Sequence, residues 1–244
     1  MTEALSILWE DEHLLVVDKP AGLLTQPRGP KVGEPSLEDR VRAHLAPGAP
    51  TEVYLGTIHR LDRPVSGVIA WAKNPRSARR LAMQFERRSV MKTYAAVLDA
   101  REGTRPDVLP DRGDAATWID GLGPVGPSGR AVVGSPEDPE SKRAETRVRR
   151  LESAVVPLGF EAVLLEPLTG RTHQLRAQAA ARGLPIAGDR AYGSSYEFDR
   201  GIALHARSLE LHHPALERRM TFVAPWPEAW RIAGFAIDDS SGLG

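Results

Sequence analysis

Short apolar runs separated by proline and glycine recur along the chain, and they restrict the possible folds more than any other feature. Helical periodicity is confined to three segments, which begin near Ser36, Asn74 and Thr172. Strands therefore outnumber helices and do not alternate strictly with them. This pattern predicts an α+β fold with a mixed, largely antiparallel central sheet flanked by helices and loops. The predicted strands cover residues 13–18, 53–58, 67–72, 93–98, 144–151, 160–166 and 202–211.

The first two helices carry recognisable start signals. Ser36 with Asp39 three residues later is typical of a capping box, and Asn74 followed by Pro75 is typical of a capped helix with proline at its first position. In the second helix we expect the arginines to point outward. The predicted buried face of that helix consists of Ala78, Leu81, Ala82 and Phe85.

Residues 101–143 break the pattern, because they contain six prolines and seven glycines and show little periodicity. A structureless loop of about forty residues is unusual inside a compact domain. We therefore expect a short hairpin around Thr117–Ile119 and an exposed excursion beyond it. The length of 244 residues, without a hinge between two cores, favours one domain over residues 1–235 and a flexible tail over 236–244.

Several classes of protein are excluded by what the sequence lacks. It has no cysteine, so disulfide scaffolds, zinc ribbons, iron–sulfur clusters and thiol nucleophiles are ruled out. No apolar run approaches the ~20 residues of a membrane span, and the N-terminus is acidic where a signal peptide would be basic. The seven histidines lack zinc-site spacing, and no Gly-rich nucleotide motif follows a strand. We expect a cytoplasmic protein without metal or cofactor.

The balanced net charge of zero conceals a basic segment. Between Arg60 and Lys92 there are nine basic residues and two acidic ones. Such a patch can attract a polyphosphate backbone, and arginine, which supplies 27 of the 32 positive charges, suits bidentate phosphate contacts. The alternative is a general bias of composition toward arginine, alanine and proline.

Two segments concentrate polar groups where catalytic residues are often found. The segment His59–Pro64 lies between two predicted strands, and its Asp62 should stay ionised between two arginines; a solvated turn is the alternative. In the segment Thr169–Arg176, a helix that begins near Thr172 would direct Arg176 inward, where it needs an acidic partner such as Asp62. An outward arginine on an amphipathic helix is the alternative there.

A third segment, Met91–Val97, contains one of only four tyrosines. Tyr94 could stack on a nucleic-acid base, although a lone tyrosine in a strand is more often an ordinary core residue.

Taken together, five blocks resemble the RluA-type pseudouridine synthases in sequence and in order. They are VVDKPAGLLTQP (16–27), HRLDRPVSGVIAWAKN (59–74), LAMQFERRSVMKTYAAVL (81–98), LLEPLTGRTHQLRAQAAARGLPIAGDRAYG (164–193) and LHARSLELHHP (204–214). The resemblance implies the fold expected above and the isomerisation of a specific uridine in structured RNA, tRNA or large-subunit rRNA, without metal or cofactor. Such an enzyme flips the target nucleotide out of the RNA.

The resemblance also implies roles for individual residues. Asp62 would be the catalytic aspartate, Arg176 its partner, and Tyr94 the aromatic residue that packs on the base. Leu175 would line the pocket, and Arg60 would contact RNA near the flipped nucleotide. The other residues expected to contact RNA are Arg171, Lys92, Arg79 and Arg80.

Two departures from the family pattern affect these expectations. Val65-Ser66 stands where relatives usually have Thr-Ser, so a hydrogen bond from that hydroxyl is in doubt. The first block begins close to Met1, so we expect no separate RNA-binding module ahead of it, and we expect a monomer. The main alternative function is a catalytically silent RNA-binding protein on the same fold, which the presence of Asp62, Tyr94 and Arg176 argues against.

Overall fold

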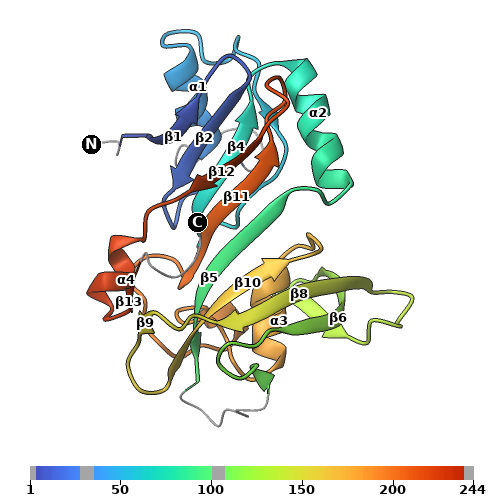
Figure 1. Cartoon of the computed structure of the whole chain (residues 1–244), viewed down its shortest axis with the longest axis vertical. Coiled ribbons are helices and arrows are strands. Elements are labelled where there is room, and N and C mark those ends of the chain that lie inside the picture. The colour runs from blue at the N-terminus through green and yellow to red at the C-terminus, as the bar shows by residue number, and fades with distance from the viewer. Residues whose placement is uncertain (1–3, 28–35, 101–107, 239–244) are drawn as a thin grey trace. The chain divides into compact units, whose positions relative to one another are not determined.

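The structure is a computed structural model, and it describes residues 4–27, 36–100 and 108–238 (Figure 1). The chain divides into two compact units. Unit 1 comprises Met1–Lys92 and Ala206–Pro225, and unit 2 comprises Thr93–His205 and Trp226–Gly244. One domain over residues 1–235 stays a prediction.

The sheet of unit 1 runs in the order β1, β2, β4, β11. β2 is antiparallel to both β1 and β4, as β3 is to β4 and β12 is to β11. β2 and β4 are buried along almost their whole length, which explains why they read as continuous apolar runs. The strands are β1 (Ser6–Glu10), β2 (Leu14–Lys19), β3 (Gly56–Thr57), β4 (Ser66–Ala72), β11 (Leu204–His212) and β12 (Arg219–Val223).

The two helices of unit 1, α1 (Leu37–Leu45) and α2 (Pro75–Glu86), start where the sequence predicts. The Ser36 hydroxyl accepts the Asp39 amide at 3.2 Å, and the Asp39 carboxylate accepts the Ser36 amide at 2.8 Å, which confirms the capping box. In α2 the prediction that Ala82 is buried is wrong. Leu81 is fully buried, and the next residue lies about 100° further round the helix, on its exposed side.

Gly67 allows β4 and β11 to approach each other closely in unit 1. A Cβ atom there would lie 2.3 Å from the Ala206 carbonyl oxygen, and φ is +115°. We expect Gly67→Ala to lower the free energy of unfolding by about 3 kcal/mol or more. Gly48 also has a positive φ, +93°, but open space around it, so Gly48→Ala should cost only about 1–2 kcal/mol. Equal losses for the two variants in urea unfolding would contradict this.

The main sheet of unit 2 runs in the order β5, β10, β8, β6, β7. β10 is antiparallel to β5 and β8, and β6 is antiparallel to β8 and β7; a separate pair joins β9 and β13. The strands are β5 (Met91–Asp99), β6 (Ala116–Val125), β7 (Ala131–Gly134), β8 (Lys142–Arg150), β9 (Ala154–Val155), β10 (Phe160–Pro167) and β13 (Ala236–Ile237). The predicted α+β class with a mixed, largely antiparallel sheet is confirmed.

The hairpin predicted around Thr117–Ile119 is present but longer than expected, because it consists of β6 and β7, and β6 also pairs with β8 on its other side. The glycines of β6 lie inside the strand instead of ending it. At Gly121 a Cβ atom would lie 2.0 Å from the Ser135 carbonyl oxygen, so the residue permits a close backbone approach. Of the predicted tail, Ala236 and Ile237 form β13, and residues 239–244 lie outside the described residues.

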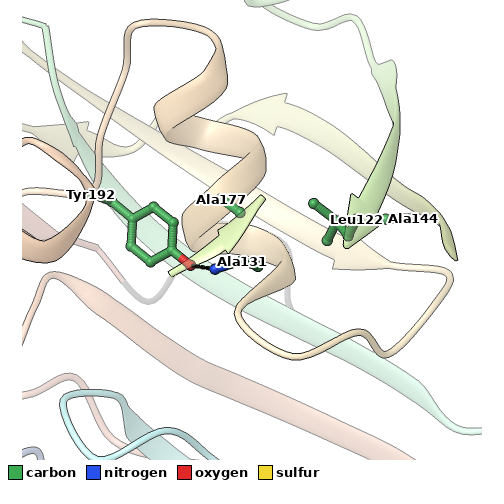
Figure 2. Close-up of a cluster of buried hydrophobic side chains, with 5 residues drawn as sticks. All are labelled: Leu122, Ala131, Ala144, Ala177 and Tyr192. Atoms are coloured by element: carbon green, nitrogen blue, oxygen red, sulfur yellow. Dashed lines mark hydrogen bonds between the residues drawn. The ribbon is translucent and has the colours of Figure 1, made fainter. Parts of the chain in front are cut away.

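The helical segments of unit 2 are α3 (Gln174–Ala181), the short 3₁₀ turn η2 (Arg190–Tyr192) and α4 (Glu228–Ile232). α3 packs against the β6–β7 hairpin (Figure 1). Figure 2 shows part of this packing, where the Tyr192 hydroxyl accepts the Ala131 amide at 2.8 Å. The cluster contains Leu122, Ala131, Ala144, Ala177 and Tyr192. In the described ranges, no helix is long and apolar enough to cross a membrane.

Candidate active site

Lys19, at the end of β2, holds the loop that carries Asp62. Its side chain has no exposed surface. The Nζ atom donates hydrogen bonds to the carbonyl oxygens of Pro20 at 2.9 Å, Leu23 at 2.7 Å and Arg63 at 3.3 Å. All three donors of the ammonium group are thus used by main-chain acceptors, and one of these acceptors directly follows Asp62.

Further bonds fix the loop on both sides of Asp62. The Thr25 hydroxyl donates to the Leu61 carbonyl at 2.7 Å and accepts the Leu61 amide at 3.2 Å. On the other side, the Gly22 amide donates to the Arg63 carbonyl at 2.8 Å, and the Arg63 Nε donates to the Gly22 carbonyl at 2.8 Å. Asp62 is therefore positioned through the main chain of its neighbours, by the turn that follows β2.

The electrostatics of this part of unit 1 are dominated by burial. Burial lowers the pKa of Lys19 to about 7, and the nearby carboxylates of Asp62 and Asp18 partly offset the effect. Burial also raises the pKa of Asp18 to about 6, against the opposing charge of Lys19. The half-buried Asp62 carboxylate therefore has a buried cation in its vicinity.

His59, the first residue of the HRLD sequence, anchors the loop as a neutral ring. Burial lowers its pKa to about 3, and the charge of Lys92 acts in the same direction. Its Nε2 accepts the Ala70 amide at 3.0 Å, and its ring stacks on Phe85 of α2 at a centroid distance of 4.9 Å. The loop is thus joined both to β4 and to α2.

In unit 2, Arg176 of α3 is buried, as the inward interpretation of its segment requires, and pairs with Asp189. Its Nε donates to Oδ2 of Asp189 at 2.6 Å, and its Nη2 donates to Oδ1 at 2.9 Å. The Arg176 Cζ lies 4.9 Å from the centroid of the Tyr192 ring. Sequence reasoning did not identify Asp189, although the rule that a buried arginine needs an acid makes it one of the candidates near Arg176 in the sequence. Pairing of Arg176 with Asp62 would join residues of different units and stays a prediction.

The turn before α3 is fixed by Gln174. Its Oε1 accepts the Thr169 hydroxyl at 2.7 Å and the Arg171 amide at 3.0 Å. Its Nε2 donates to the Thr146 hydroxyl on β8 at 2.9 Å. His173, just before the helix, has a left-handed backbone with φ of +56°, so α3 begins at Gln174 and not at Thr172.

Tyr94 lies on the same face of the unit 2 sheet as α3. It is directly opposite Leu165 of β10, which is in turn opposite Val148 of β8. Directly paired residues point to one side of a sheet, as do residues two apart in a strand. Thr146 therefore shares this side, and it bonds to Gln174 of α3. Within unit 2, the sheet thus presents Tyr94 on the face covered by the helix that bears Leu175 and Arg176.

The predicted RNA contacts in unit 1 differ in how tightly they are held. Arg60 and Arg79 are exposed, and the side chain of Arg79 makes no hydrogen bond or ion pair with the described residues. Arg80 is exposed too, but it donates to the Pro214 carbonyl. Lys92 is half-buried, and burial lowers its pKa.

Arg171 and Val65 are two further residues of the predicted site. Arg171, in unit 2, is half-buried, and its Nε donates to the Arg143 carbonyl at 3.2 Å. Val65, at the position where the resemblance implies threonine, is buried in the core of unit 1, which suits its apolar side chain. Across the described part of the chain, no group of three or more His, Asp or Glu side chains is arranged to hold a metal ion.

Comparisons with known proteins agree with the resemblance. The family model for RNA pseudouridylate synthase matches residues 13–181. The tRNA pseudouridine synthase C of Yersinia pestis is 32% identical over 251 residues, covering 93% of this chain and 88% of that protein. The dual-specificity RNA pseudouridine synthase RluA of Escherichia coli (strain K12) is 34% identical over 223 residues, covering 91% and 93%.

A solved structure is similar as well. Human RNA Pseudouridylate Synthase Domain Containing 1 has a TM-score of 0.73 at 26% identity, over 97% of this chain and 89% of that chain. Asp62, Tyr94 and Arg176 all lie inside the segment that the family model matches, whereas Asp189 lies beyond its end.

Proposed function

The chain belongs to the RNA pseudouridylate synthase family, and we propose that it converts a specific uridine of tRNA or large-subunit rRNA to pseudouridine with Asp62 as the catalytic residue. The protein is an RNA pseudouridine synthase. In the reaction, the bond from uracil N1 to ribose C1′ breaks and a bond from uracil C5 to C1′ forms. A proton leaves C5 and N1 gains one, so no atom is added or lost. The observation that carries the proposal is the fixed placement of Asp62 beside Lys19.

The roles proposed for Tyr94, Leu175 and Arg176 follow from their place in unit 2, where Tyr94 lies on the face of the sheet that α3 covers. A stacked uridine cannot present its glycosidic bond to a side chain, so the nucleotide must leave the stack at a cost of about a few kcal/mol. We assign to Tyr94 the packing on the extruded base, which must stay bound while it rotates. Leu175 lines the pocket, and Arg176 stabilises the anionic form of Asp62.

The RNA backbone is proposed to bind along α2 and the loop beside it. α2 is held rigidly in unit 1, because Gln84 exchanges two hydrogen bonds of 2.8 Å with the main chain of His212. The stack of His59 on Phe85 links it to the Asp62 loop. Phosphates bound by exposed arginines of α2 would therefore be fixed relative to Asp62. Arg60, Lys92, Arg79, Arg80 and Arg171 are the proposed RNA contacts.

Charge reversal at Arg79 tests this surface. We expect Arg79→Glu to weaken RNA binding and to reduce the slope of log Kd against log salt by about one. Arg79 is the preferred site, because reversal of Arg80 would also break its bond to Pro214. Arg231→Glu, an exposed helical arginine of unit 2, is the control and should leave the slope unchanged. An unchanged slope for Arg79→Glu in filter binding would refute the contact.

Pseudouridine mapping tests the function itself. The purified protein is incubated with transcribed tRNA and ribosomal RNA, and new pseudouridines are located by carbodiimide modification and primer extension. A new pseudouridine at a defined position supports the proposal and names the substrate. Binding without any new pseudouridine favours a silent RNA-binding protein. We expect a cytoplasmic monomer that needs neither metal nor cofactor, so that activity persists in excess EDTA.

A further inference from the structure

We propose that Asp189 is a positioning residue for Arg176, which keeps the guanidinium oriented and charge-compensated throughout the reaction. The proposal rests on the proposed function, in which Arg176 supports the anionic Asp62. Asp189 acts only through Arg176 and is not assigned any contact with RNA.

The geometry fixes the guanidinium in two ways. Both carboxylate oxygens of Asp189 accept hydrogen bonds from one edge of the Arg176 guanidinium, which consists of Nε and Nη2. The ring of Tyr192 supports the guanidinium at 4.9 Å from its centroid. Bidentate pairs restrict orientation more than single contacts.

Asp189 is itself held in place. Asp189 is only 1% exposed, and its amide donates to the Ile186 carbonyl at 2.9 Å. Its own carbonyl accepts the amides of Tyr192 at 2.9 Å and Ser194 at 3.1 Å. Three main-chain bonds thus fix the backbone of Asp189, so its carboxylate provides a rigid reference for Arg176.

A fixed second carboxylate is needed because the charge of Asp62 changes during catalysis. If Asp62 bonds to the ribose or the uracil ring, or accepts a proton, its negative charge is lost. A buried guanidinium whose only counter-ion was Asp62 would then be uncompensated, and an unpaired buried charge costs several kcal/mol. Asp189 keeps Arg176 paired at every stage, so the arginine stays in place for the return step.

Asp189→Asn tests the proposal, because asparagine preserves shape but removes the charge. We expect kcat to fall about 10- to 100-fold, as misplacement of a catalytic group by about 1 Å does, while KM for RNA changes less than about threefold. The matched control is Asp120→Asn, because Arg182, directly after α3, also pairs with a carboxylate, Asp120, at 3.0 Å and lies 4.7 Å from the Trp118 ring centroid. That variant should lose stability but keep kcat within about threefold.

A double-mutant cycle separates positioning from a structural role. If Asp189 acts through Arg176, Arg176→Lys combined with Asp189→Asn should be no slower than Arg176→Lys alone; additive losses of kcat would overturn the proposal. Should Asp189→Asn fail to fold, Asp189→Glu keeps the charge but displaces it, and a normal kcat in that variant would overturn the proposal. A wild-type protein that forms no pseudouridine would instead refute the proposed function.

Discussion

Asp62→Asn should abolish pseudouridine formation while leaving the fold intact. The asparagine preserves the volume of the side chain, and the main-chain bonds of Leu61 and Arg63 that place the loop do not involve the carboxylate. Only the anionic oxygen is lost. Removal of an essential catalytic group commonly costs a factor of about 10³ or more in kcat. Single-turnover assays should show a loss of this size, with the affinity for RNA and the unfolding midpoint close to those of the wild type.

Asp18→Asn is the matched control for Asp62→Asn. Both carboxylates act on Lys19, and both raise its pKa against the effect of burial. If the loss of activity reflected only a disturbed Lys19, the two variants would be equally impaired. We expect Asp18→Asn to keep activity within about tenfold of the wild type. Equal loss in both variants, or full product yield from Asp62→Asn, would contradict a catalytic role specific to Asp62.

Local signals in the sequence predicted much of the fold. The capping box at Ser36 and the Asn74-Pro75 start predicted both helices of unit 1, because caps depend on a few neighbouring residues. The strand that begins near Ser66 was visible as an apolar run because both of its faces are buried. β6 could not be recognised in this way, because its sequence contains glycines. In a sequence, a glycine that ends a strand cannot be distinguished from a glycine that permits close packing until the neighbouring segment is known.

The candidate site was predictable only in part, and for a similar reason. The resemblance singled out Asp62, Tyr94 and Arg176 by their sequence blocks. It did not show that Lys19 bonds to the loop through carbonyl oxygens, because every residue has a carbonyl and such contacts leave no trace in side-chain identity. Asp189 could have been suspected from the rule that a buried arginine needs an acid, but choosing among the acids required the fold of η2 against α3.

Lys19→Met should disable the enzyme through the loop, and it should do so with a distinctive dependence on pH. Methionine has a similar length but removes the Nζ donor from the carbonyls of Pro20, Leu23 and Arg63. The Arg63 carbonyl keeps the Gly22 amide, and each carbonyl that loses its donor costs about 1–3 kcal/mol. With one of the two bonds to the Arg63 carbonyl removed, the loop holds Asp62 less firmly. We expect kcat to fall by about 100-fold or more, and urea unfolding to show lower stability.

We expect the ammonium form of Lys19 to be the active one. With a folded-state pKa of about 7, Lys19 loses a proton, and with it one of three donors and the charge near Asp62, as pH rises through 7. Wild-type kcat should therefore decline on the alkaline side, and this limb should be absent in Lys19→Met. Stability should change in the opposite sense. The unfolded lysine keeps its proton to about pH 10.4. As the pH rises from about 7 to about 10.4, the wild type therefore gains stability relative to Lys19→Met. An alkaline limb that persists in Lys19→Met would show that another group controls the rate.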